Sequence, residues 1–175
     1  MKFRLAWLAV LATLALAGAV QAADDWKTYR YPQYGFAAEY PIPPKALDQK
    51  PEPQRVIRAI QYWSERDDVA FGVNATHFLH KIIAGQPPDK LIQNVIEGVR
   101  GSLKCSIRSQ RALTFPGATA REVIFDKCPA PIAEAQERIF IAGDRLFQVM
   151  VLGKSGIVES SDTKRFLESF SLIAQ

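Results

Sequence analysis

The sequence predicts an antiparallel α+β fold, and the order of its segments indicates this class. Pairs of strand-like segments joined by short turns come first, followed by one amphipathic helix, further strand pairs and a closing helix. Antiparallel strands can be joined by tight turns, whereas parallel strands need long crossover connections. One sheet with helices packed on its faces is the simplest way to bury the apolar stripes of such a chain.

Turn residues mark the first two hairpins. Four segments form them: residues 26–31 with 35–40 around Pro32-Gln33-Tyr34, and residues 56–64 with 69–77 around the polar run 65–68. In the last segment apolar side chains alternate with small or polar ones, the period-2 pattern of a strand with one buried face. Five prolines between Pro41 and Pro53 predict a loop, because proline cannot donate a backbone hydrogen bond to a neighbouring strand.

Two helices and a last hairpin complete the predicted elements. The range Asp89–Leu103 follows Pro87-Pro88 and carries one apolar stripe with helical spacing: Leu91, Ile92, Val95, Ile96, Val99 and Leu103. A second helix is expected near Ser161–Phe170, with Ser161 as its N-cap. Between the helices, Gly143-Asp144 joins residues 138–142 to residues 145–152 as a two-residue hairpin turn.

Residues 1–22 have the features of a secretory signal peptide. Lys2 and Arg4 precede an apolar run, and Val20-Gln21-Ala22 places small residues before a cut that follows Ala22. A retained anchor helix is the alternative, but the run is shorter than the ~20 residues of a membrane span. We therefore expect a periplasmic or secreted protein, with residues 23–175 as a single domain and no membrane insertion after cleavage. The signal peptide holds two basic residues and no acid, so its removal lowers the formal net charge from +4 to +2.

Cys105 and Cys128 form a predicted disulfide. Export brings the chain into an oxidising compartment, where a pair of cysteines is a disulfide candidate first. They lie at equal distances on either side of Pro116-Gly117, a strong turn signal between two strand-like segments, so a hairpin centred there places the two sulfurs opposite each other. A different loop length would shift this register by one residue. Two unpaired buried thiols, or a metal or redox role, are the alternatives.

Short motifs near both ends of residues 23–175 resemble the PsbP-like family. They are Trp26-Lys-Thr-Tyr29, Tyr34-Gly35-Phe36, Glu39-Tyr40-Pro41, Phe147-Gln-Val149, Gly153 and Arg165-Phe166-Leu167-Glu168-Ser169-Phe170. The family includes the photosystem II extrinsic subunit, a Ran-binding nuclear import factor and exported bacterial proteins of unknown role. The resemblance implies an α-β-α sandwich with a central antiparallel sheet. It implies no chemistry, because the matched positions are core aromatic and turn residues, and characterised members act by binding partners.

The residues themselves point to no catalytic, cofactor-binding or metal-binding site. Gly153-Lys154-Ser155 matches the end of a phosphate-binding loop, but Gln148 stands where that motif needs glycine. His77 and His80 are the two histidines, and residues three apart on a strand point to opposite faces. We read them as exposed or loop-packing side chains, with a weak metal site as the alternative.

The basic residues are scattered without interleaved aromatic side chains, which argues against a nucleic-acid partner. The densest group includes Arg111 and Arg121, which could lie near each other across the predicted hairpin. The favoured function is an exported, non-catalytic interaction or accessory module of the bacterial envelope with a protein partner. A periplasmic enzyme or thiol-active protein that uses Cys105 is the alternative, and a ligand or metal carrier is a third. Neither the partner nor the oligomeric state can be read from the sequence.

Overall fold

The computed structural model describes residues 25–49 and 53–173. The predicted signal peptide and its cleavage site lie outside these residues. No helix in the described ranges is long and apolar enough to cross a membrane.

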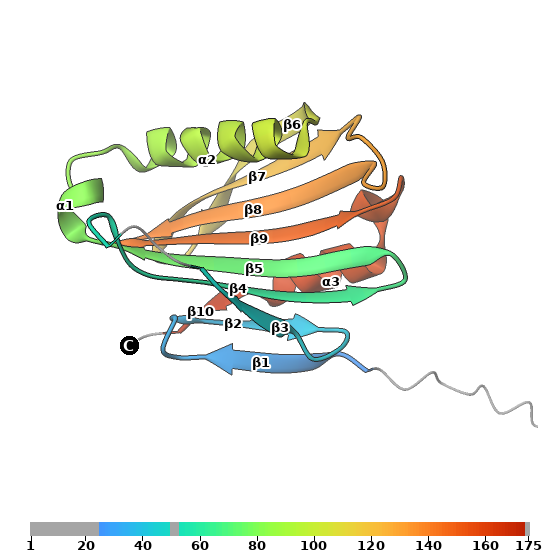
Figure 1. Ribbon diagram of the computed structural model, residues 1–175, viewed down its shortest axis with the longest axis horizontal. Coiled ribbons are helices and arrows are strands. Elements are labelled where there is room, and N and C mark those ends of the chain that lie inside the picture. The colour runs from blue at the N-terminus through green and yellow to red at the C-terminus, as the bar shows by residue number, and fades with distance from the viewer. Residues whose placement is uncertain (1–24, 50–52, 174–175) are drawn as a thin grey trace, which may run out of the picture.

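Seven strands form one antiparallel sheet in the order β3-β4-β5-β9-β8-β7-β6 (Figure 1). Their bounds are β3 Lys45–Asp48, β4 Val56–Arg66, β5 Val69–Phe78, β6 Ser106–Phe115, β7 Ala118–Asp126, β8 Glu134–Ala142 and β9 Arg145–Gly153. Most neighbours in this order are also consecutive strands of the chain. The exception is the pair of β5 and β9, which brings the first and last parts of the chain together in the middle of the sheet.

Helices and a second, smaller sheet lie on the two faces of the large sheet (Figure 1). The helices are α1 His80–Ile83, α2 Pro88–Leu103 and α3 Ser161–Ser169, and a short 3-10 turn, η1, spans Ile157–Glu159. The small sheet has the order β1-β2-β10, with β1 Lys27–Tyr31, β2 Phe36–Tyr40 and β10 Ser171–Leu172. The described chain is thus an α+β protein with antiparallel sheets, as predicted.

Each face of the large sheet has its own core. On the face that α2 covers, called here the α2 face, Ile92 and Ile96 of the helix are fully buried against Val123, Phe125 and Ile139 of the sheet. On the opposite face, called the α3 face, α3 and the small sheet enclose a core rich in aromatic side chains: Phe36, Tyr40, Phe71, Phe140, Phe147, Phe166 and Phe170. The apolar stripe predicted for the first long helix is therefore the side that packs on the sheet.

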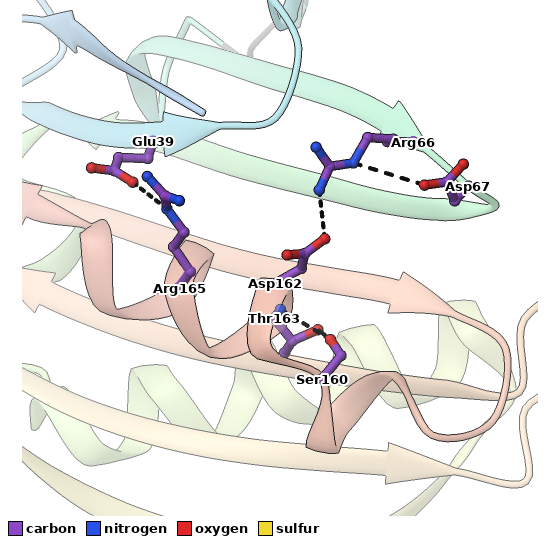
Figure 2. Close-up of polar contacts among 7 residues, drawn as sticks. All are labelled: Glu39, Arg66, Asp67, Ser160, Asp162, Thr163 and Arg165. Carbon is purple, nitrogen blue, oxygen red and sulfur yellow. Dashed lines mark hydrogen bonds and ion pairs between the residues drawn. The ribbon is translucent and has the colours of Figure 1, made fainter. Parts of the chain in front are cut away.

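Ion pairs at the edge of the α3 face attach α3 to both sheets (Figure 2). Arg165 of α3 donates to Glu39 of β2 at 2.7 Å, and Arg66 at the end of β4 donates to Asp162 of α3. Both guanidinium groups also lie over the ring of Trp26, at 5.1 Å for Arg165 and 5.5 Å for Arg66. These contacts hold the residues just before β1 against α3 and the large sheet.

Several predicted boundaries differ from the structure. The proline-rich segment 41–53, expected to be a loop, contains β3, because Lys45–Asp48 is a proline-free stretch that pairs with β4. The turn between β4 and β5 has two residues and not four, since Asp67 and Asp68 both have positive φ and fit the tight hairpin turn. The N-cap of α3 is Ser160, whose hydroxyl accepts a hydrogen bond from the backbone N–H of Thr163 at 3.1 Å (Figure 2).

The buried face of α2 yields a stability prediction. We expect Ile96→Ala to lower the free energy of unfolding by about 2–5 kcal/mol, because it removes a fully buried side chain and leaves a cavity. The exposed Asn94→Ala on the same helix should change it by less than about 0.5 kcal/mol. Urea denaturation of both variants measures this. Equal stabilities would mean that α2 presents a different face to the sheet.

Candidate functional site

The structure joins Cys105 and Cys128 in a disulfide, with their Cα atoms 4.2 Å apart. Cys105 follows Lys104, the C-cap of α2, and Cys128 follows Lys127 just after the end of β7. The bridge therefore fixes the C-terminal end of α2 to the sheet on which it packs. No free cysteine occurs in the described part of the chain, so thiol chemistry at Cys105 would first require reduction of this bridge.

The predicted pairing of the cysteine hairpin holds for most of its length and then shifts. Residues Ser109 to Phe115 pair with β7 in the predicted register. A bulge near Arg108 then shifts the pairing by one residue, so direct opposition does not extend to the cysteines. Lys127 adopts a positive φ of 52° before Cys128. The disulfide was thus predicted correctly, but the bulge and this turn bring the sulfurs together in place of simple cross-strand opposition.

The two histidines contact different residues and do not form a common site. His77 is near the end of β5 on the α3 face, between Arg58 of β4 and Arg145 of β9 in the strand register. Burial lowers its pKa, and the positive charge of Arg145 lowers it further. His80 begins α1 and contacts Asp144 at 2.9 Å. Among residues 25–49 and 53–173, no group of three or more His, Cys, Asp or Glu side chains is placed to hold a metal ion.

Arg111 and Arg121 do not form a joint basic patch. Arg111 pairs with Glu122 across the hairpin, while Arg121 is one position further along and points to the opposite face. The Arg111 guanidinium donates to Glu122 at 2.8 Å, and Arg121 donates to Asp89 of α2 at 2.7 Å. Each charge is therefore matched by an acid, and the predicted proximity of the two arginines is wrong because neighbouring positions on a strand alternate between faces.

The α2 face is only partly covered by its helix. In the described chain α2 packs on β7 and β8, whereas β3, β4 and β5 continue the same face beyond it (Figure 1). We call the part formed by β3, β4 and β5 the open half of the α2 face. Leu47 of β3 lies on it with 51% of its surface exposed and pairs with Gln61 of β4, whereas Trp63 of β4 pairs with Lys45.

Trp63 lies flat against the sheet on the open half. It is paired with Gly72 of β5, and a Cβ atom at Gly72 would come within about 2.4–2.5 Å of three atoms of the indole ring. The absence of a side chain at Gly72 is therefore what lets the indole rest on the backbone. The indole N–H donates to the side-chain oxygen of Gln61 at 3.2 Å, which fixes the orientation of the ring.

A row of polar side chains leads from the open half to a buried acid under α2. Gln61, Asn74 and Gln148 are direct neighbours on β4, β5 and β9. Asn74 donates to Gln148 at 3.3 Å, and Gln148 donates to Glu137 of β8 at 2.8 Å. Glu137 is fully buried, and its second carboxylate oxygen has no hydrogen-bond partner among the described residues. Burial raises its pKa to about 7, although the bond from Gln148 opposes this shift.

Next to this row, a pocket of about 260 Å³ opens between α1, α2 and the sheet. Phe78 of β5, Ile141 of β8 and Leu146 of β9 line it from the sheet. Four aliphatic side chains line it from the helices: Ile82 and Ile83 of α1, and Leu91 and Val95 of α2. Four polar residues complete the lining: Arg55, Gln86, Asn94 and Arg145. The α2 face thus carries an apolar pocket at one end and a flat polar and aromatic surface beyond the helix.

Sequence reasoning missed both parts of this face. The strand that carries Glu137 was predicted to begin at residue 138, but β8 begins at Glu134. Ala135, Ile139 and Ile141 occupy the same alternate positions as Glu137, but the polar run Gln136-Glu137-Arg138 hides this alternation in the sequence. The pocket depends on α1, which has four residues and is too short to show helical periodicity.

Comparison with known proteins adds information about the fold. No family model matches the sequence, and no curated protein matches it. Among solved structures, the chain is similar to cyanobacterial PsbP (CyanoP) from Synechocystis sp. PCC 6803, with a TM-score of 0.61. The similar region covers 91% of this chain and 98% of that chain. The chain has a PsbP-like fold. The PsbP-like fold implied by the short motifs is therefore confirmed. The sequence identity of 11% is too low to assign a function to any residue of this protein.

The disulfide predicts a measurable loss of stability on reduction. We expect reduction to lower the free energy of unfolding by about 3 kcal/mol, because the bridge closes a loop between residues separated by 23 positions. Urea denaturation with and without dithiothreitol measures this. Cys105→Ser and Cys128→Ser should behave alike, and the double variant should be no less stable than either. Alkylation of both thiols in unreduced protein would show that the bridge is absent.

The buried carboxyl of Glu137 predicts a pH dependence of stability. Its pKa in the folded protein is about 7, above the ordinary value of 4.5. Between pH 4.5 and 7, the folded state therefore keeps a proton that the unfolded chain has lost. The stabilising contribution is complete below pH 4.5 and is lost as the pH rises to 7, a change of about 3 kcal/mol.

Glu137→Gln removes the ionisable group and keeps an oxygen that can accept the bond from Gln148. The difference in unfolding free energy between the variant and the original protein should therefore grow in favour of the variant from pH 4.5 to 7. Urea denaturation across this range measures it, and other titrating groups such as His77 cancel in the difference. A constant difference would mean that Glu137 keeps its ordinary pKa.

Proposed function

We propose that residues 23–175 form an exported, non-catalytic interaction or accessory module that binds a protein partner in the bacterial envelope, in the periplasm or after secretion. We also propose that its helix and sheet layers form the α-β-α sandwich that the family resemblance implies, with the small sheet added to one layer. Residues 1–22 act as the cleaved signal peptide. The partner contacts the open half of the α2 face.

The flat indole of Trp63 on Gly72 is the observation that carries this proposal. Tryptophan is enriched at the energetic centres of protein interfaces, because it buries a large area while losing little side-chain freedom. Here the ring is held by the backbone below it and by the bond to Gln61, so it is ordered before a partner binds. The exposed Leu47 lies on the next strand, two positions from Lys45, the direct partner of Trp63, and adds a second apolar side chain to the open half.

The surroundings of Trp63 suit binding more than a reaction. Gln61, Asn74 and Gln148 are amides that neither donate nor accept protons in ordinary acid–base catalysis. Glu137, the acid at the end of the row, is fully buried and does not reach the surface beside Trp63. Rigid strands present the amides, and such elements position contact groups well. The PsbP-like fold agrees with a binding role, because the characterised members of the PsbP-like family act by binding partners.

A photo-crosslinking experiment tests the proposed surface. The full chain, produced with its own residues 1–22, would carry a photoreactive amino acid at Leu47, or at the exposed Gln110 on the opposite edge strand as a matched control. We expect a specific adduct with an envelope protein from position 47 and none from position 110. Trp63→Ala should weaken binding of that protein by about 30-fold, the loss of a typical interface centre.

The same experiment can contradict the proposal. Equal adducts from both positions, or unchanged binding by a folded Trp63→Ala protein, would exclude the open half as the contact surface. N-terminal sequencing of the exported protein tests the localisation separately, since it should begin at Ala23.

A further inference from the structure

Glu137 is a buried carboxyl group whose hydrogen bonding is incomplete. It lies on β8 between Val123 of β7 and Met150 of β9, both apolar, and no part of its side chain is exposed. Gln148 donates to one carboxylate oxygen at 2.8 Å, and the second oxygen has no hydrogen-bond partner among the described residues. Burying a charged oxygen without a donor is costly, because the oxygen loses the water that would otherwise solvate it. The site therefore favours the neutral acid.

The charged side chains around Glu137 are paired with one another or exposed. Arg121 of β7 donates to Asp89 of α2 at 2.7 Å. Arg100 of α2 donates to Glu97 of the same helix at 2.7 Å. In the described ranges, the other charged side chains on α2 or on the α2 face are exposed: Lys45, Glu65 and Lys90. The influences on the pKa of Glu137 are burial, which raises it to about 7, and the bond from Gln148, which opposes this.

The amide row connects this acid to the open half. Gln148 accepts a hydrogen bond from Asn74 at 3.3 Å and donates one to Glu137, so an N–H group of each amide points toward the acid. Asn74 lies on β5 in the open half and is half-buried, with Gln61 as its direct neighbour on β4. Consecutive hydrogen bonds polarise one another. Loss of the Glu137 proton therefore strengthens the bond from Gln148 and, through it, the longer bond from Asn74.

We propose that the proton on Glu137 controls binding at the open half, so that the partner binds the neutral form and binds more weakly once the proton is lost. This inference rests on the proposed function for its partner. A partner seated on the open half covers Asn74 and excludes the water that solvates the row. Without that water the charged form of Glu137 is less stable, so binding and loss of the proton oppose each other. Glu137 is thus a positioning residue, which acts through the amides and touches no partner.

The coupling along the row can be measured in the protein alone. An NMR titration from pH 5 to pH 9 follows the carboxyl carbon of Glu137 and the side-chain amide groups of Gln148 and Asn74. We expect the amide signals to change with the same midpoint as the carboxyl carbon, near pH 7. In Glu137→Gln this step should be absent. The indole N–H of Trp26, which packs on the α3 face, is the internal control and should show no step at this midpoint.

The effect on binding is measured with the envelope protein that the crosslink from position 47 identifies. We expect it to bind about fivefold more weakly at pH 8 than at pH 6, the change that a tenfold preference for the neutral form produces. Glu137→Gln should bind equally at both pH values, because it stays neutral. Glu137→Met is a second neutral variant if the first does not fold. His77→Asn removes a titrating group on the α3 face and should keep the fivefold difference.

Three results would overturn the inference. The first is a set of amide signals from Asn74 and Gln148 that does not follow the midpoint of Glu137. The second is equal binding of the envelope protein at pH 6 and pH 8. The third is a fivefold difference that persists in a neutral variant. Each of these leaves the crosslink from position 47 intact, whereas the absence of that crosslink contradicts the proposed function and, with it, this inference.

Discussion

The packing of Phe170 against aromatic rings from both sheets is the contact on which the α3 face depends. Its ring lies 4.7 Å from Phe140 and 5.6 Å from Phe147 of the large sheet, and 6.1 Å from Phe36 of the small sheet. Phe170 is also the residue at which α3 ends and after which β10 begins. One buried side chain therefore fixes the end of the last helix, the start of the last strand and the distance between the sheets. Stacked and edge-on aromatic pairs favour such defined geometries over a loosely packed core.

The α2 face is open because of the widths of its elements. Strands lie about 4.8 Å apart, so seven of them span roughly 30 Å, whereas a helix with its side chains is about 10 Å wide. On the α3 face, α3 and the small sheet together supply the missing width. On the α2 face α2 covers β7 and β8, and the strands beyond it carry amides and Trp63 where an enclosed sheet would carry aliphatic residues. The chemistry of the open half is thus the consequence of one helix on a wide sheet.

The sequence predicted elements whose signals are local. The stripe on α2, the alternation in β5 and the turn at Pro116-Gly117 each lie within one segment, and each element forms as expected. The prediction failed where a local signal was weak. β3 is short and surrounded by prolines, and Glu137 interrupted the apolar pattern at the start of β8. The pocket could not be predicted, because α1, β8 and β9 meet there only after the sheet has formed.

The open half and the pocket share one origin and remain separate as sites. Both exist because α2 is narrower than the face beneath it, and α2 is held at its C-terminal end by the bridge between Cys105 and Cys128. Fixed there, the helix leaves its first turns, with Leu91 and Val95, to enclose the pocket beside α1. Trp63 lies on strands outside the reach of the helix. A partner on the open half would therefore cover polar and aromatic surface without closing the pocket.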